Sequence, residues 1–151
     1  MDNRAEYGVE LFKEGCSCAQ AVLCAYADVL GVDRKTLLKI AMPFGGGMGR
    51  MREVCGAVSG MFMAAGLLYG TDTVGDREAK TAHYKLIQEL AAKFREINGS
   101  IVCRELLGLA RPEGTYVPEE RTKEYYSKRP CGGYIRCAIE ILEKYREDNG
   151  V

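Results

Sequence analysis

Apolar residues recur at helical intervals along almost the whole chain, and this spacing restricts its fold more than any other feature. No alternating apolar and polar pattern of strand length interrupts it, and only four prolines occur among the 151 residues. There is no internal repeat and no linker-like stretch, and a chain of this length can bury one core. We therefore expect an all-α fold: a single domain over residues 1–151, built as an irregular bundle of about five to seven helices.

Capping residues and glycines indicate where these helices begin and end. The expected helices cover residues 3–14, 17–31, 33–40, 52–68, 76–97, 100–108 and 130–146, and residues 119–127 form a turn or two. Ser17, Asp33, Asp76 and Ser100 are suitable N-caps for four of them. Residues 42–49, Met-Pro-Phe-Gly-Gly-Gly-Met-Gly, predict a loop with unusual backbone dihedrals, because glycine tolerates left-handed conformations.

The stretch from Val54 to Thr71 carries no charged residue. Its length is at the threshold for crossing a bilayer, but Gly56, Gly60 and Gly66 dilute its hydrophobicity. A central helix buried on all sides explains the same composition. We expect that helix, and no membrane association.

Charge and cysteine content exclude several further classes of protein. The chain has 21 Lys and Arg against 21 Asp and Glu, so it lacks the net positive charge of a nucleic-acid-binding protein. The first residues contain no apolar signal segment, which predicts a cytoplasmic location where thiols stay reduced. Seven cysteines is an odd number and cannot pair completely. We expect metal ligation, redox chemistry or simple burial of thiols rather than a disulfide scaffold.

Four of the cysteines share a position on the expected helices. Cys18, Cys103 and Cys131 fall in first turns on apolar stripes, and Cys55 lies near the start of the central helix. The N-terminus of a helix carries unpaired N–H groups and a partial positive charge, which stabilise a thiolate. No pair shows the C-x-x-C spacing of zinc ribbons or thioredoxin-like proteins. Four such thiols on four helices could nevertheless meet at one end of a bundle and hold a negatively charged cluster.

The central helix also carries small residues on one face. Gly56 and Gly60 are four apart, and Ala64 continues the strip. Glycine inside a helix costs about 0.5–1 kcal/mol relative to alanine, so these glycines indicate a close approach. Either another helix or a cofactor could pack against this face, and both interpretations remain open at this stage.

Taken together, these residues resemble a known family. The pattern combines Cys-Ala-Gln at residues 18–20, a glycine-rich loop, Cys-Gly-Ala-x-x-Gly at 55–60, a cysteine ahead of Arg-Glu-Leu-Leu-Gly at 103–108, and Cys131 opening the last helix. Over roughly residues 5–145 the chain is similar to the redox-active proteins named C_GCAxxG_C_C. The resemblance implies a site of four cysteines that binds an iron–sulfur cluster. A similar module accompanies an iron–sulfur centre beside haem in split-Soret cytochromes.

The chain departs from the family pattern in three extra cysteines. Cys24 and Cys137 are expected to be buried as small apolar residues, and Cys16 is a candidate spare ligand or resolving thiol. The last family cysteine could be Cys131 or Cys137, and the apolar stripe of the final helix favours Cys131. The roles of the three extra cysteines are not fixed by the sequence.

The leading functional hypothesis is an electron-transfer or redox accessory protein rather than a stand-alone enzyme. Its iron–sulfur cluster would be held by Cys18, Cys55, Cys103 and Cys131, with Gly56 and Gly60 beside it, and it would act with an unidentified redox partner protein; a homodimer is left open. One alternative is thiol–disulfide exchange, with Cys16 or Cys18 as nucleophile. Another is a structural zinc site of four thiolates in an interaction module.

The glycine-rich loop does not match a phosphate-binding motif. No strand precedes it, and no Lys-Ser or Lys-Thr pair follows it. Arg50 and Arg52, which come directly after the loop, leave an anion contact open.

Overall fold

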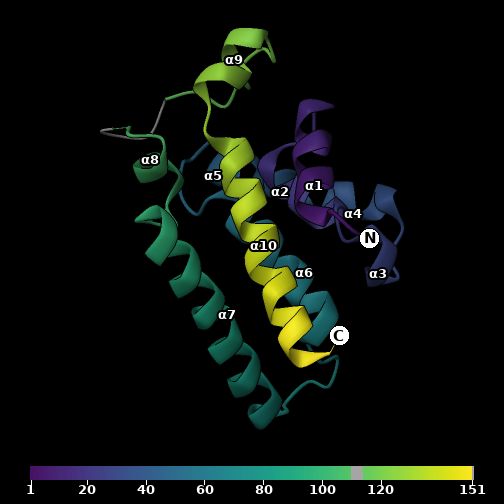
Figure 1. Ribbon diagram of the computed structural model, residues 1–151. Coiled ribbons are helices and arrows are strands. Elements are labelled where there is room, and N and C mark those ends of the chain that lie inside the picture. The colour runs from purple at the N-terminus through teal and green to yellow at the C-terminus, as the bar shows by residue number, and fades with distance from the viewer. Residues whose placement is uncertain (110–113, 151) are drawn as a thin grey trace.

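Helices account for the regular structure of the chain, as the apolar spacing predicts (Figure 1). The computed structural model describes residues 1–109 and 114–150. Its elements are α1 (Arg4–Lys13), α2 (Cys18–Cys24), α3 (Ala27–Leu30), α4 (Arg34–Ala41), the 3-10 turn η1 (Met42–Phe44), α5 (Gly45–Met48), α6 (Gly56–Tyr69), α7 (Arg77–Asn98), α8 (Cys103–Leu106), α9 (Lys123–Lys128) and α10 (Cys131–Asn149). Those with six or more residues are α1, α2, α4, α6, α7, α9 and α10. Over the described ranges there is no β-strand, which confirms the all-α prediction.

Helix α6 lies at the centre of the bundle, as expected for the uncharged stretch. It packs against α2, α7 and α10, and α10 in turn packs along α1 (Figure 1). Its side chains Val58, Met61 and Ala64 are completely buried, and so is Ile135 on the facing side of α10. Within the described ranges, none of the helices combines the length and the apolar character that a bilayer crossing requires.

Most helix starts follow the capping residues read from the sequence. The Ser17 hydroxyl accepts from the Gln20 backbone N–H while the Gln20 side chain accepts from Ser17, which makes a complete capping box. Asp33 and Asp76 cap α4 and α7 in the expected way. Helix α8 is the exception, because its N-cap is Val102 and not Ser100. The Ser100 hydroxyl instead accepts a hydrogen bond from the backbone N–H of Val102, before the helix begins.

The second helix ends earlier than predicted. A single helix was expected from Ser17 to Gly31, but α2 ends at Cys24 and α3 follows after a turn. The turn buries Tyr26 completely, and its hydroxyl donates to the Ile139 carbonyl at 3.3 Å. Apolar periodicity alone does not reveal this break, because its partner lies on the last helix.

The central helix begins at Gly56 rather than near residue 52. Between residues 46 and 52, every residue except Met51 has a positive φ, including the non-glycine residues Met48, Arg50 and Arg52. The chain then runs extended: Cys55 N–H donates to the Ile101 carbonyl (2.7 Å), and Cys103 N–H donates to the Glu53 carbonyl (2.5 Å). This short pairing holds two cysteine-bearing segments side by side before either enters its helix.

Candidate functional site

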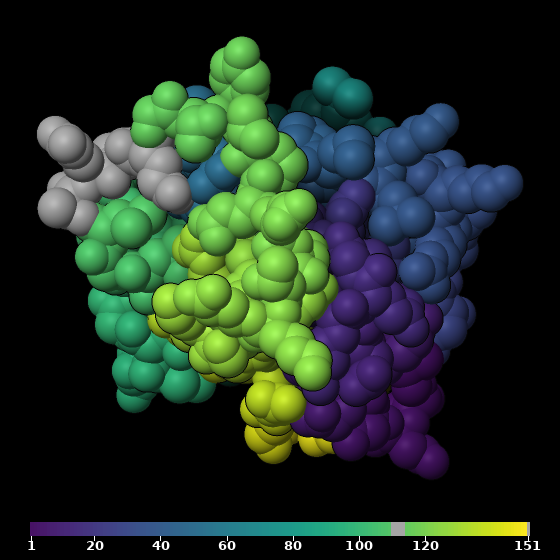
Figure 2. Space-filling view, turned by 90° about the horizontal axis from the view of Figure 1, so that it is seen from above, coloured from purple at the N-terminus to yellow at the C-terminus, as the bar shows by residue number. Residues whose placement is uncertain are grey.

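Four cysteines line one small cavity at the end of the bundle where several helices begin. Cys18, Cys103 and Cys131 are the first residues of α2, α8 and α10, and Cys55 is the N-cap of α6. The cavity has a volume of about 60 Å³, and all four side chains contribute to its wall. We call it the four-cysteine cavity. The chain segment that carries α9 crosses this end of the molecule (Figure 2).

Cys55 and Cys103 are diagonal neighbours in the extended pairing, because Cys55 lies opposite Ile101 and Cys103 lies opposite Glu53. Burial raises the pKa of Cys55 to about 12, although the backbone N–H groups of Ala57 and Val58 oppose the rise by donating to its sulfur. Burial also raises the pKa of Cys103. The guanidinium of Arg52 acts in the opposite direction and lowers this pKa, since its Nη1 donates to the Cys103 sulfur at 3.7 Å. The first turn of α6 therefore donates to a thiol of the site, as the helix-start argument predicts. The thiolate is nevertheless not favoured, because burial outweighs these hydrogen bonds and the pKa of Cys55 lies above its ordinary value.

Cys18 and Cys131 form a close pair. A hydrogen bond between the two sulfurs, in which Cys18 donates, lowers the pKa of Cys131 to about 7 and raises that of Cys18 well above its ordinary value. Burial acts against the lowered pKa of Cys131, while the guanidiniums of Arg129, Arg52 and Arg121 favour its thiolate. The other three thiols of this site have a raised pKa, so the lowered value belongs to the Cys18–Cys131 pair.

Three arginines contribute to the wall of the cavity. Arg52 comes from the left-handed loop, whereas Arg121 and Arg129 flank α9. The Arg121 guanidinium lies 4.7 Å from the Phe12 ring centre and 4.8 Å from that of Tyr125, and it donates to the carbonyls of Phe12 and Cys16. Positive side chains around several thiols favour a negatively charged occupant.

Two glycines let the backbone approach the thiols closely. A Cβ on Gly47 would lie 2.6 Å from the Cβ of Cys103, and one on Gly56 would lie 3.1 Å from the Cβ of Cys18. Both residues line the four-cysteine cavity. Gly60, which was expected beside the cofactor, does not line it. Its Cβ position is 2.8 Å from the Ala19 carbonyl oxygen, so Gly60 serves the close packing of α6 on α2.

The remaining cysteines lie outside this cavity. Cys24 is 1% exposed in the core, and burial raises its pKa to about 11. Cys16 is buried between α1 and α2. Cys137, half-buried on α10, accepts a hydrogen bond from the Asn98 amide at 3.3 Å. None of the three contributes to the wall that the described residues form around the cavity.

The donor set suits a thiophilic metal centre by its chemistry. Thiolates are the usual protein ligands of iron–sulfur clusters and of structural zinc. Over residues 1–109 and 114–150, however, no three His, Cys, Asp or Glu side chains are already grouped closely enough to hold one metal ion. A single zinc ion would therefore require the cysteine side chains to turn toward it. An iron–sulfur cluster does not need three protein ligands around one ion, because its thiolates bind different irons.

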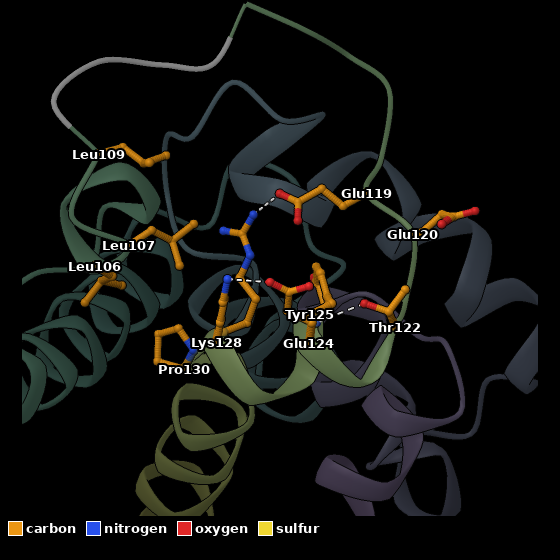
Figure 3. A pocket seen from close by; sticks show the side chains of 11 residues that line it. Leu106, Leu107, Leu109, Glu119, Glu120, Thr122, Glu124, Tyr125, Lys128 and Pro130 are labelled. Carbon is orange, nitrogen blue, oxygen red and sulfur yellow. Dashed lines mark hydrogen bonds and ion pairs between the residues drawn. The ribbon is translucent and has the colours of Figure 1, made fainter.

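A larger cavity of about 820 Å³ adjoins the site between α8 and α9 (Figure 3). It shares Leu106, Leu107, Tyr125 and Arg129 with the four-cysteine cavity, but no cysteine is among the described residues that line it. Glu124 pairs with Lys128 across its rim at 2.5 Å.

Sequence reasoning missed the side chains that surround the sulfurs. Arg129 stands two residues before Cys131, so its proximity could have been inferred from the chain. Arg121 and Tyr125 line the cavity because the segment that carries α9 packs next to it. No local sequence pattern predicts this position. Arg52 was noted for an anion contact, but its position beside Cys103 depends on the left-handed loop.

Comparison with known proteins gives one family and one relative. A family model described as "Putative redox-active protein (C_GCAxxG_C_C)" matches residues 16–145. A protein of Archaeoglobus fulgidus described as "Uncharacterized protein" is 32% identical over 141 residues, which cover 88% of this chain and 86% of the relative. No solved structure matches the chain.

Proposed function

The chain belongs to the C_GCAxxG_C_C family of redox-active proteins, and from that membership we propose that the four-cysteine cavity holds an iron–sulfur cluster and serves in electron transfer. The observation that carries the proposal is the shared wall: four thiols, each at the start of a different helix, line one cavity. Packing alone does not explain this arrangement, because another small apolar residue could fill each of the four positions. The electron donor or acceptor is proposed to be a separate redox protein.

The surroundings support a negatively charged occupant. The helix-start N–H groups of Ala57 and Val58 already donate to Cys55, and Arg52 donates to Cys103. Hydrogen bonds to cluster sulfurs and nearby positive charge raise the reduction potential of such centres. Arg121 and Arg129 add positive charge from the side of α9.

An iron–sulfur cluster would supply reversible one-electron transfer at this site. The chain's own contributions are ligation by Cys18, Cys55, Cys103 and Cys131, close backbone approach at Gly47 and Gly56, and charge compensation by arginine. Leu106, Leu107 and Tyr134 form an apolar part of the wall and limit the access of water. Cys18 and Cys131 would each be a thiolate when bound, so any thiol proton that they carry would be released on ligation.

The test is anaerobic reconstitution of the protein with ferrous iron and sulfide. The wild-type protein should gain broad visible absorption together with bound iron and acid-labile sulfide, and Cys55→Ser should abolish or sharply weaken both. Cys24→Ser is the matched control, because Cys24 is as buried as Cys55 but lies outside the cavity. Equal behaviour of the two variants, or stoichiometric zinc and never iron, would contradict electron transfer and favour the zinc alternative.

A second candidate function is thiol–disulfide exchange between Cys18 and Cys131, which their direct hydrogen bond favours. The Cys131 thiolate would attack an external disulfide, forming a mixed disulfide and releasing one thiolate. The deprotonated Cys18 would then attack the Cys131 sulfur and expel the second thiolate. The external disulfide is thereby reduced to two thiols, while Cys18 and Cys131 become a disulfide.

The reactivity of Cys131 tests this second candidate. The rate at which iodoacetamide alkylates Cys131 in the reduced, metal-free protein should be half-maximal near pH 7, the pKa of this thiol. The rate should decrease at lower pH, because only the thiolate reacts. Removing the donor with Cys18→Ala should move the midpoint up toward the ordinary thiol value of 9.0. Cys24, whose pKa is about 11, is the internal control. Equal reactivity of Cys131 and Cys24 at neutral pH would exclude Cys131 as the nucleophile.

A further inference from the structure

A third space, open to solvent, adjoins the four-cysteine cavity on the side of the glycine-rich loop. Its volume is about 470 Å³, within the range of about 300–1,000 Å³ typical of small-molecule sites. The two spaces share Ser17, Gly46, Arg52, Arg121, Tyr125 and Arg129. A molecule in this outer pocket would thus be separated from the thiols by side chains that both spaces have in common.

The outer pocket is lined by four arginines. Arg50, Arg52, Arg121 and Arg129 contribute to it, and Glu119 is the one acidic side chain among its described lining residues. Arg50 and Arg129 are largely withdrawn from solvent, with side chains 11% and 17% exposed. Both pair with Glu119, the former at 3.7 Å. Positive charge concentrated in a concave, partly desolvated space attracts anions.

The backbone that supplies two of these arginines is held in an unfavourable conformation. Arg50 has a φ of 68° and Arg52 a φ of 58°, in the left-handed region that non-glycine residues seldom adopt. Such conformations are retained at sites where a side chain must be aimed in a particular direction. Here Arg52 lines both spaces, whereas Arg50 lines the outer pocket alone.

We propose that the outer pocket binds a small anion through phosphate or carboxylate groups, with Arg50 and Arg129 as its principal contacts. Guanidinium groups bind both kinds of anion through paired hydrogen bonds. Glu119 occupies these arginines in the absence of a ligand and, being 41% exposed, can turn outward when one binds. The exposed tyrosine Tyr116 and the half-buried Tyr125 provide apolar surface for the rest of the molecule.

A purely structural role for these charges is the competing explanation. Arg50 also donates to the Val117 carbonyl, so its pairing with Glu119 could serve only to fasten residues 115–121 over the loop. The two explanations differ in what Glu119 does. If the pocket binds an anion, Glu119 competes with that anion for the arginines, and removing its charge should strengthen binding. If the contact only fastens residues 115–121, removing the charge should not strengthen anion binding.

Calorimetric titration of the metal-free protein with inorganic phosphate and, separately, with succinate distinguishes them. At least one probe should bind to the wild-type protein at low salt, and the choice between them identifies the ligand group. Arg50→Gln should weaken that binding about tenfold or more, the loss expected for one charge-assisted hydrogen bond. Glu119→Gln should strengthen it. Arg77→Gln, which removes an exposed arginine at the start of α7, should leave it unchanged.

Absence of binding with both probes would overturn the proposal, and so would equal weakening by Arg50→Gln and Arg77→Gln. Weaker binding in Glu119→Gln would favour the fastening role instead. If the Arg50→Gln variant does not fold, the Glu119→Gln variant still distinguishes the two explanations, because only an anion site predicts tighter binding of the probe. Because the titration uses protein without metal, its outcome is independent of whether an iron–sulfur cluster forms.

Discussion

The two ends of helix α6 lie in different surroundings, although both contain glycine. At the N-terminal end, a Cβ on Gly56 or Gly60 would meet the backbone of α2 at 3.1 and 2.8 Å. At the C-terminal end, a Cβ on Gly66 would meet nothing within 4 Å. There Tyr69 packs edge-on against Tyr145, with ring centres 5.1 Å apart. Among the glycines inside α6, only those near the thiols are crowded by a neighbouring helix.

This difference separates what builds the site from what builds the bundle. Glycine destabilises a helix interior, so its presence at Gly56 and Gly60 is explained by the closeness of α2, which carries Cys18. Nothing in the structure explains Gly66. The small-residue strip of α6 is therefore a packing surface that brings two cysteine-bearing helices together, and only Gly56 at its end reaches the cavity.

Charged side chains differ in the same way between the two ends. Away from the cavity, Arg4 is 5% exposed, donates to the Ala25 carbonyl (2.6 Å) and pairs with Asp28 (2.5 Å) and Glu143 (2.9 Å). Arg52 is as deeply buried, but it donates to the sulfur of Cys103. One buried arginine thus joins α1 to α3 and α10, while the other faces the proposed redox centre.

The largest expected effect belongs to Arg4. Arg4→Met removes the buried partner of Asp28 and Glu143 and should lower the free energy of unfolding by about 2–3 kcal/mol, less than for a fully buried pair because the two carboxylates are 39% and 29% exposed. The measurement is urea unfolding, with Arg136→Met as control. Arg136 pairs with Glu6 at a half-exposed position, and its loss should cost no more than about 1 kcal/mol. If the folded Arg4 variant fails to acquire the wild-type chromophore, the separation of the two ends is wrong.

Gly60→Ala should have the next largest effect. The added methyl group would lie 2.8 Å from the Ala19 carbonyl oxygen and from the Val22 Cβ, so α2 and α6 must move apart. Overpacking of this kind costs about 1–3 kcal/mol, measured by urea unfolding. Reconstitution should also suffer, because the same movement shifts Cys18 relative to Cys55. An unchanged stability would show that the close approach is not needed.

Gly66→Ala should have the smallest effect and the opposite sign. Nothing obstructs the methyl group, so the variant gains the helix propensity of alanine, about 0.5–1 kcal/mol. Thermal or urea unfolding of the Gly60 and Gly66 variants side by side compares one substitution at two places in one helix. Destabilisation at Gly66 would mean that both ends of α6 are equally constrained.

Much of the fold follows from local sequence signals. Ser17, Asp33 and Asp76 cap helices where their side chains indicate, and the uncharged stretch forms the buried centre. The break after α2 could not be predicted, because it depends on the distant contact of Tyr26 with Ile139. The late start of α6 depends likewise on the pairing of residues 53–55 with residues 101–103.

The site shows the same division. Helix-start position identifies the cysteines that the structure brings to one cavity, and it leaves out Cys24 and Cys137. Their mutual arrangement could not be predicted, because sequence position does not reveal that the thiol of Cys18 lies beside that of Cys131 or that the segments carrying Cys55 and Cys103 run side by side. The arginine wall and the packing role of Gly60 also require the three-dimensional arrangement.

The most direct test of the four-cysteine centre is a crystal structure of anaerobically reconstituted protein, with anomalous diffraction measured on both sides of the iron absorption edge. An iron signal should lie in the cavity, within bonding distance of the sulfurs of Cys18, Cys55, Cys103 and Cys131. The other three cysteines should carry none. An iron signal elsewhere, or a cavity that stays metal-free with its thiols unmoved under these conditions, would contradict the account.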